Sequence, residues 1–166
     1  MMKSRRRKSN IKISFFSFLS HSIIFIMGCF LGIYALTILT APRTPTNEKF
    51  KEALTNAKYE GFFVKNLEGS NFLYWGKGQI ALSKNMIIFQ GKLSPGPDYK
   101  LYLTKKFIQN NKDFLKIKDK SLLVGDVRSF QGFILKSDQE LDLASYNSIV
   151  IWSELFSVFI TSAKYK

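Results

Sequence analysis

Tyr146–Tyr165 reads Y-N-S-I-V-I-W-S-E-L-F-S-V-F-I-T-S-A-K-Y, and it is the most apolar run outside the N-terminus. Its β-branched and aromatic residues favour strands. The aliphatic neighbours of Trp152 predict that this side chain is a core residue rather than the wall of a ligand pocket. Three apolar residues then alternate and predict one buried strand face: Phe156, Val158 and Ile160. Because Phe159 points to the opposite face, the stretch predicts two closing strands with a two-sided core.

Upstream of this stretch, short β-type segments are separated by turn signals at intervals of roughly 8–12 residues. Ser94–Asp98 is a predicted turn, because Pro presets φ and Gly tolerates positive φ. Residues 105–120 read as a polar loop with room for one short element, and 138–146 as an approach segment. The predicted strands are 61–64, 72–82 with a glycine bulge or bend at 76–78, 85–89, 99–104, 122–127 and 130–135. This spacing predicts an all-β fold for residues 59–166, an antiparallel β-sandwich or a barrel-like domain.

A long apolar segment lies near the N-terminus. Ile13–Leu39 contains 27 residues without a charge. As a helix it would be roughly 40 Å long, enough to cross a hydrocarbon core of about 30 Å. A cleaved signal peptide normally has an apolar region of only about 7–15 residues before small residues. No A-x-A site precedes Pro42, and ten apolar residues follow Cys29, where a lipoprotein would turn polar. We therefore expect one uncleaved transmembrane helix, a signal-anchor, at 13–40.

Charge sets the expected orientation of this helix. Residues 1–12 carry six basic residues and no acidic one. A basic N-terminus also occurs in nucleic-acid-binding proteins, but the apolar segment that follows favours the positive-inside rule. We expect 1–12 to be a cytoplasmic tail, 41–58 a linker with a short helix from Glu48 to Lys58, and 59–166 an extracytoplasmic domain. The expected location is the cell membrane, with the domain periplasmic in a Gram-negative cell.

The remaining charge is spread more evenly. From Ala41 onward there are 19 Lys and Arg and 12 Asp and Glu, a net charge of +7. This pattern is typical of a solvated surface with a weak attraction to anionic lipid or polymer.

Two residue types that carry much enzyme chemistry are absent from the domain. The single cysteine, Cys29, and the single histidine, His21, both lie in the apolar segment. This excludes a Cys/His zinc site, covalent haem attachment through C-x-x-C-H, a Ser-His-Asp triad and a Cys-His pair after residue 40. We expect no catalytic residue, no metal ligand and no cofactor. Three aspartates that are well separated in the sequence leave a calcium site open as an alternative: Asp98, Asp126 and Asp142. Of these, Asp98 and Asp142 are expected to hold turns.

Several motifs together resemble one known family. They are S-P-G-P-D-Y-K-L-Y-L at 94–103, G-D-V-R-S-F-Q-G at 125–132, D-L-A-S-Y-N-S-I-V-I-W at 142–152 and F-S-V-F-I-T-S-A at 156–163. Their order and spacing resemble the DM-thirteen (DM13) domain over most of residues 60–166. The resemblance implies a small β domain described as an electron-transfer module. In bacteria such a domain often stands alone behind a membrane anchor.

The chain departs from the family pattern at two positions. The family typically ends in Tyr, a β-branched run, Trp-Cys and then F-x-V-x-F-G-x-A. Ser153 stands at the position of the cysteine, and Thr161 at that of the late glycine. The other family-motif residues are present: Trp152, Phe156, Val158 and Ala163. A serine hydroxyl cannot cycle between thiol and disulfide and is a poor soft-metal ligand. We expect Ser153 to lie unpaired at a strand end and Glu154 to be solvated.

These observations predict a non-catalytic binding or accessory module at the outer face of the membrane. The alternative is an electron-transfer component that uses a bound cofactor or a redox partner. The expected partners are the lipid bilayer and an envelope protein of unknown identity, with no nucleic acid.

Overall fold

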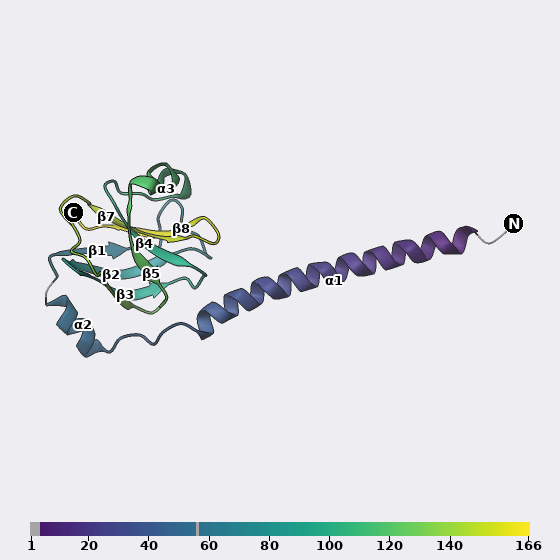
Figure 1. The fold of residues 1–166 in the computed structure, drawn as a ribbon, viewed down its shortest axis with the longest axis horizontal. Coiled ribbons are helices and arrows are strands. Elements are labelled where there is room, and N and C mark those ends of the chain that lie inside the picture. Colours follow the sequence, from purple (N-terminus) through teal and green to yellow (C-terminus); the bar gives the residue numbers. More distant parts are fainter. Residues whose placement is uncertain (1–3, 56) are drawn as a thin grey trace. The chain divides into compact units, whose positions relative to one another are not determined.

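The computed structural model describes residues 4–55 and 57–166, which form two compact units that divide after Leu36. The first unit is made by helix α1, Ser4–Leu39, which continues into the second unit for three residues (Figure 1). Within it, Phe15–Leu39 is long and apolar enough to cross a membrane and is not buried against protein. The helix of the predicted anchor is therefore present, and it begins earlier than the apolar segment. Lys3, part of the predicted basic tail, lies outside the described residues.

The second unit contains two four-stranded antiparallel sheets. The first has the order β1-β2-β3-β6, with β1 Tyr59–Phe63, β2 Gly76–Ser83, β3 Met86–Leu93 and β6 Phe133–Lys136. The second has the order β5-β4-β7-β8, with β5 Leu122–Val127, β4 Tyr99–Thr104, β7 Ser148–Ser153 and β8 Val158–Lys164. Side chains from both sheets share one apolar cluster, so the arrangement is sandwich-like.

Three helical segments accompany the sheets, so the prediction of an all-β fold is only approximate. They are α2 Asn47–Leu54, α3 Asn111–Ile117 and the 3-10 turn η1 Lys118–Lys120. Phe50 and Ala53 of α2 are buried in a cluster with Ala81 and Ile88 of the first sheet. The predicted helix after the linker is thus confirmed, although it ends at Leu54. Asn56, inside the predicted range, lies outside the described residues.

The second sheet is buried on both faces, as the position of Phe159 predicted. All six residues of β7 are buried. Ile149 and Ile151 belong to the cluster between the sheets, whereas Val150 and Trp152 belong to a second cluster that includes Phe114 of α3. Phe159 is in this second cluster and Ile160 in the first. We call the side toward the other sheet the inner face and the side covered by α3 the outer face.

The predicted bulge at residues 76–78 is wrong. Residues 72–75 precede β2, and β2 pairs with β3 in unbroken register. Gly78 lies opposite Gly91, and a Cβ added to Gly78 would come within 2.5 Å of the Gly91 Cα. These glycines therefore allow close approach of two strands, and Gly78 adopts a φ of 147°, a backbone conformation that favours glycine.

A register shift occurs instead in the closing pair of strands. Ile151 pairs with Thr161 and Trp152 with Phe159, which leaves Ile160 as the extra residue of a bulge. The predicted burial of Ile160 is confirmed, and Val158 is partly buried. The prediction for Phe156 is wrong, because this residue lies in the turn before β8 and is 40% exposed.

Candidate functional site at the end of β7

Trp152 lies on the outer face of β7 and is fully buried. Its ring packs against Phe114 of α3 with centroids 4.9 Å apart, and Phe114 contacts the ring of Tyr102 on β4 at 5.3 Å. The three rings form one column that joins the strands to the helix. The prediction that Trp152 is a core residue is confirmed.

Ser153 lies on the inner face and is also fully buried. Its neighbours across the sheet are Tyr99 on β4 and Val158 on β8. Its Oγ donates a hydrogen bond to the carbonyl oxygen of Pro97 at 2.8 Å. The prediction of an unpaired serine is wrong, because the turn before β4 brings the Pro97 carbonyl to the end of β7.

The turn that meets Ser153 has a defined geometry. Asp98 adopts a φ of 52°, in the left-handed region that Asp tolerates better than most residues. Its carbonyl oxygen accepts a hydrogen bond from the Glu154 backbone N–H at 3.0 Å. A Cβ added to Gly96 would lie 2.4 Å from the Tyr99 hydroxyl oxygen, so glycine is required there. The predicted turn at 94–98 is confirmed, and one hydrogen bond ties it to Ser153 of β7 and another to Glu154, the residue after the strand.

Glu154 is the centre of a polar cluster on the outer side. Its carboxylate accepts hydrogen bonds from the Tyr102 hydroxyl and from Lys118 Nζ, the latter at 2.5 Å. The Glu154 and Lys118 side chains are 25% and 28% exposed. Lys118 Nζ also lies 5.6 Å from the centre of the Trp152 ring, within the range of a cation–π interaction. The prediction that Glu154 is solvated is wrong, because η1 covers it.

The cluster shifts the pKa values of both acids. Burial acts to raise the pKa of the Glu154 carboxyl, but the hydrogen bonds from Lys118 and Tyr102 outweigh it and leave the pKa below its usual value. The Trp152 indole adds a weaker contribution of the same sign, although its N–H lies outside hydrogen-bond geometry. Burial, and then the bond to Glu154, raises the pKa of Tyr102. At neutral pH the pair is therefore a neutral phenol and an ionised carboxylate.

A second charged group lies at the start of β4. Lys100 Nζ contacts Asp126 at 2.6 Å and Asp98 at 3.2 Å, and Arg128 contacts Asp126 at 3.0 Å. The hydrogen bonds from Lys100 and then from Arg128 lower the pKa of Asp126. Pairing of β4 with β5 thus brings together two carboxylates that are 28 residues apart in the sequence.

This group does not favour the calcium alternative. Lys100 bridges Asp98 and Asp126, whereas Asp142 accepts hydrogen bonds from Ser145 in its own turn. The turn roles predicted for Asp98 and Asp142 are confirmed. Among residues 4–55 and 57–166, no three His, Cys, Asp or Glu side chains are grouped to hold a metal ion.

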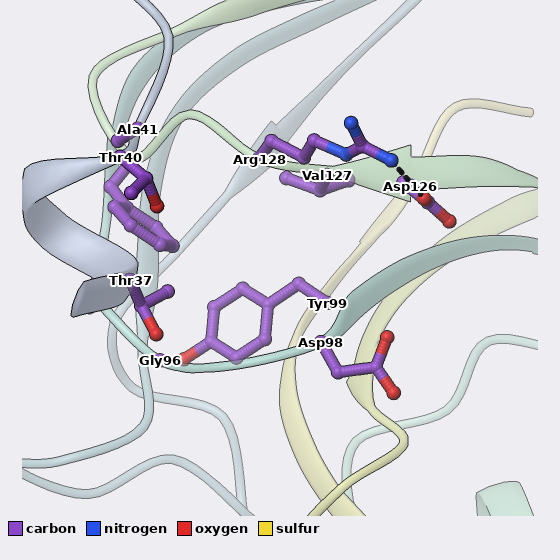
Figure 2. Close-up of a pocket in the computed structure, with 10 residues that line it drawn as sticks. Thr37, Thr40, Ala41, Gly96, Asp98, Tyr99, Asp126, Val127 and Arg128 are labelled. Atoms are coloured by element: carbon purple, nitrogen blue, oxygen red, sulfur yellow. Dashed lines mark hydrogen bonds and ion pairs between the residues drawn. The ribbon is translucent and has the colours of Figure 1, made fainter. Parts of the chain in front are cut away.

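A cavity of about 330 Å³ adjoins these charges (Figure 2). Gly96, Asp98 and Tyr99 form one wall, and Figure 2 shows Arg128 reaching across to Asp126 on another. Its remaining lining residues belong to the same compact unit: Thr37, Thr40, Ala41, Val127 and Phe130. Its walls combine paired charges with apolar side chains. Ordered water would fill such a cavity as well as a small polar ligand would, so the cavity does not identify a ligand.

Thr161, the second departure from the family pattern, is accommodated by a glycine. A Cβ added to Gly76 would lie 2.5 Å from Thr161 Cγ2. The threonine methyl group therefore occupies the space that a side chain at residue 76 would need. Its Oγ1 is buried without a hydrogen-bond partner, so the hydroxyl is tolerated rather than used.

The fold is a small β domain with two sheets. At the end of β7, where the family motif lies, Ser153 is buried and hydrogen-bonded, and the ion pair of Glu154 with Lys118 lies beside it. A family model described as Electron transfer DM13 matches residues 68–165, and the chain belongs to this family. Neither a curated protein nor a solved structure gives a match.

Sequence reasoning missed the partners of Glu154. Tyr102 and Trp152 lie on the same face of neighbouring strands. The alternation of residues 99–104 could have predicted that Tyr102 lies on the other face of the strand from Tyr99. Lys118 lies in the polar segment 105–120, where no periodicity marks it. Its contact with Glu154 depends on how α3 and η1 pack, which the sequence pattern does not encode.

Proposed function

We propose that this DM13 protein is anchored in the membrane and acts, without catalysis, as a binding or accessory module at the outer face. The observation that carries the proposal is the state of Ser153. At the position where the family resemblance places a cysteine, a fully buried hydroxyl donates to the Pro97 carbonyl. A hydroxyl in that role holds a turn and cannot take part in thiol–disulfide chemistry.

The composition of the domain supports the same proposal. Cys29 and His21 both precede residue 40, so the β domain has neither thiol nor imidazole. The polar groups at the end of β7 are engaged with one another in ion pairs and hydrogen bonds. Such a module offers a rigid surface to a partner, and α1 offers an apolar segment that would keep it at the membrane.

Co-purification from membranes of the native host tests this proposal. The full-length protein, cross-linked before solubilisation, is expected to retain envelope-assembly proteins. A Ser153→Ala variant should retain the same partners, because the proposed role does not use the hydroxyl chemically. Recovery of redox carriers, or loss of all partners in the Ser153→Ala variant while it stays folded, would contradict it.

Electron transfer is the second candidate function, and the Tyr102–Glu154 contact favours it. Tyr102 and Trp152 are oxidisable and are linked through Phe114. If a partner with an oxidising metal centre accepts one electron from Tyr102, the phenolic proton can pass to the Glu154 carboxylate. The products are a neutral tyrosyl radical, a protonated Glu154 and the partner reduced by one electron, so charge and atoms balance.

Two measurements test this second function. Flash photolysis with a ruthenium(III) photo-oxidant should generate a tyrosyl radical signal that disappears in Tyr102→Phe and weakens in Glu154→Gln. An absorption spectrum of the protein purified from its own host would reveal a bound haem or copper. Absence of a Tyr102-dependent radical together with a featureless visible spectrum would leave the accessory function as the supported one.

A further inference from the structure

One end of the sandwich gathers the loops on either side of Trp75. Ser94 N–H donates to the Trp75 carbonyl oxygen at 2.9 Å, and Glu154 N–H donates to the Asp98 carbonyl oxygen at 3.0 Å. Leu93 N–H donates to the Phe130 carbonyl oxygen at 2.8 Å. Together these bonds place four loops at the same end of the two sheets, which we call the Trp75 end: residues 64–75, 94–98, 128–132 and 154–157.

Large apolar side chains are exposed on two of these loops. Phe72 is 86% exposed and lies beside exposed Leu73, and Leu155 is 55% exposed and lies beside exposed Phe156. Scattered apolar residues on a surface need no explanation, but adjacent pairs on two loops that both bond to loop 94–98 form a larger feature. Water is a poor environment for these four side chains.

The loop that carries Phe72 and Leu73 is held in place. Asn71 Oδ1 accepts hydrogen bonds from the backbone N–H groups of Leu73 at 2.8 Å and Tyr74 at 3.0 Å. Asn71 N–H donates in turn to the Tyr74 carbonyl oxygen at 2.9 Å. The next residue, Trp75, is fixed to Ser94 through both its N–H and its carbonyl group. The turn therefore presents two apolar side chains outward on a constrained backbone.

Exposed basic groups accompany the apolar ones. Lys65 Nζ lies 3.7 Å from the centre of the Trp75 ring, and Lys77 and Arg128 are exposed nearby in the fold. Three acidic groups of this end contact lysines, since Asp98 and Asp126 contact Lys100 and Glu154 contacts Lys118. Glu68, in loop 64–75, accepts a hydrogen bond from Asn110. Arg128 also contacts Asp126, whereas Lys65 and Lys77 form no ion pair with a carboxylate of the described residues and leave a positive border beside the apolar side chains. Apolar side chains bordered by positive charge suit the headgroup boundary of an anionic lipid surface.

The chain enters the domain at this same end. Ala41 comes two residues after the end of the apolar helix. It packs against the cluster between the sheets and lines a cavity with Gly96, Val127 and Phe130. At the opposite end, the turn between β2 and β3 is polar and exposed, and Lys84 there pairs with Glu140 at 2.9 Å. The apolar loops thus lie at the end of the domain where the chain enters it after the apolar helix.

We propose that the Trp75 end docks on the bilayer surface, with Phe72, Leu73, Leu155 and Phe156 entering the headgroup boundary. The partner is an anionic lipid surface. The inference rests on the proposed membrane anchorage, because the apolar helix is what would bring the domain to lipid. Docking would fix which surfaces of the domain remain available to an envelope partner.

Quenching of Trp75 fluorescence by brominated lipid tests the docking. The full chain is reconstituted into phosphatidylcholine–phosphatidylglycerol vesicles with and without bromine atoms near the headgroup end of the acyl chains. Trp152 is buried beneath α3, so the quenched emission is expected to come from Trp75 and to be absent in Trp75→Phe. Phe72→Ser/Leu73→Ser should reduce the quenching to the level of Trp75→Phe. The double variant Leu115→Ser/Leu123→Ser, which removes two exposed apolar side chains from α3 and β5, should not.

Co-flotation with the vesicles separates the two proposals. If the chain floats with the vesicles and Trp75 is quenched, docking is supported. Flotation without quenching of Trp75, or with quenching that Phe72→Ser/Leu73→Ser leaves unchanged, overturns docking while membrane anchorage stands and indicates that these side chains face a protein. If the chain does not float, the anchorage fails, and docking fails with it.

Discussion

The inner and outer faces of β7 receive alternate residues of one motif and use them differently. On the inner face, Ile149 and Ile151 are followed by Ser153, whose single polar group bonds to a backbone carbonyl. On the outer face, Trp152 lies beneath α3 and next to an ion pair. A substitution at residue 153 therefore acts on the turn before β4, whereas one at residue 152 acts on the helix and the charged cluster. Because residues 152 and 153 act on different parts of the structure, substitutions at these two positions test the two faces separately.

Removal of Trp152 should have the largest effect. Trp152→Ala leaves a cavity between β7 and α3 and should lower the free energy of unfolding by about 3–5 kcal/mol. Ile151→Val, on the inner face, removes a single methyl group and should cost only about 0.5–1.5 kcal/mol. Urea titration of the full-length protein in detergent measures both. Equal losses would mean that the Trp152 ring contributes far less packing between β7 and α3 than its burial implies.

Breaking the ion pair on the outer face should have an intermediate effect. Glu154→Gln removes the charge that Lys118 and Tyr102 contact and should cost about 1–3 kcal/mol. A double-mutant cycle with Lys118→Met isolates the coupling between the two side chains, which are each about three-quarters buried. Coupling close to zero would show that the ion pair does not help to hold η1 against the sheet.

Changes at Ser153 should have a smaller effect. Ser153→Ala loses one hydrogen bond to Pro97 and should cost about 0.5–1.5 kcal/mol. Ser153→Cys, made in a Cys29→Ser background, should keep the fold and place a thiol where maleimide cannot reach it until the chain is unfolded. Rapid labelling of the folded variant would show that the end of β7 opens in solution.

The pH dependence of stability should show the smallest difference. Because the folded pKa of Glu154 lies below its ordinary value of 4.5, the ionised form stabilises the fold above that pH. This contribution is lost as the pH falls from 4.5 through the folded pKa. Thermal denaturation between pH 7 and pH 3 should therefore be less steep in Glu154→Gln than in the unmodified protein. Parallel curves would assign the acid sensitivity to other carboxylates, of which Asp126 is the first to examine.

The sequence predicted best what depends on local alternation. The strand boundaries 99–104 and 122–127 agree with β4 and β5, and the closing pair of strands is as expected. The predicted strand at 72–82 is too long, because residues 72–75 precede β2. The predicted bulge is also wrong, because Gly78 lies against Gly91 on another strand. In the same way, the partner of Ser153 lies in a turn 56 residues away. Contacts of this range depend on strand order, which periodicity does not contain.

The methyl group of Thr161 over Gly76 has a consequence for how such a sequence can change over generations. A side chain at residue 76 and a threonine at residue 161 exclude each other, because both need the same space. A lineage can reach the present pair without passing through a strained intermediate only if glycine is already at residue 76 when threonine arrives. Among relatives, threonine at residue 161 should therefore occur only with glycine at residue 76, and relatives with that glycine but without the threonine would record the order of the two substitutions.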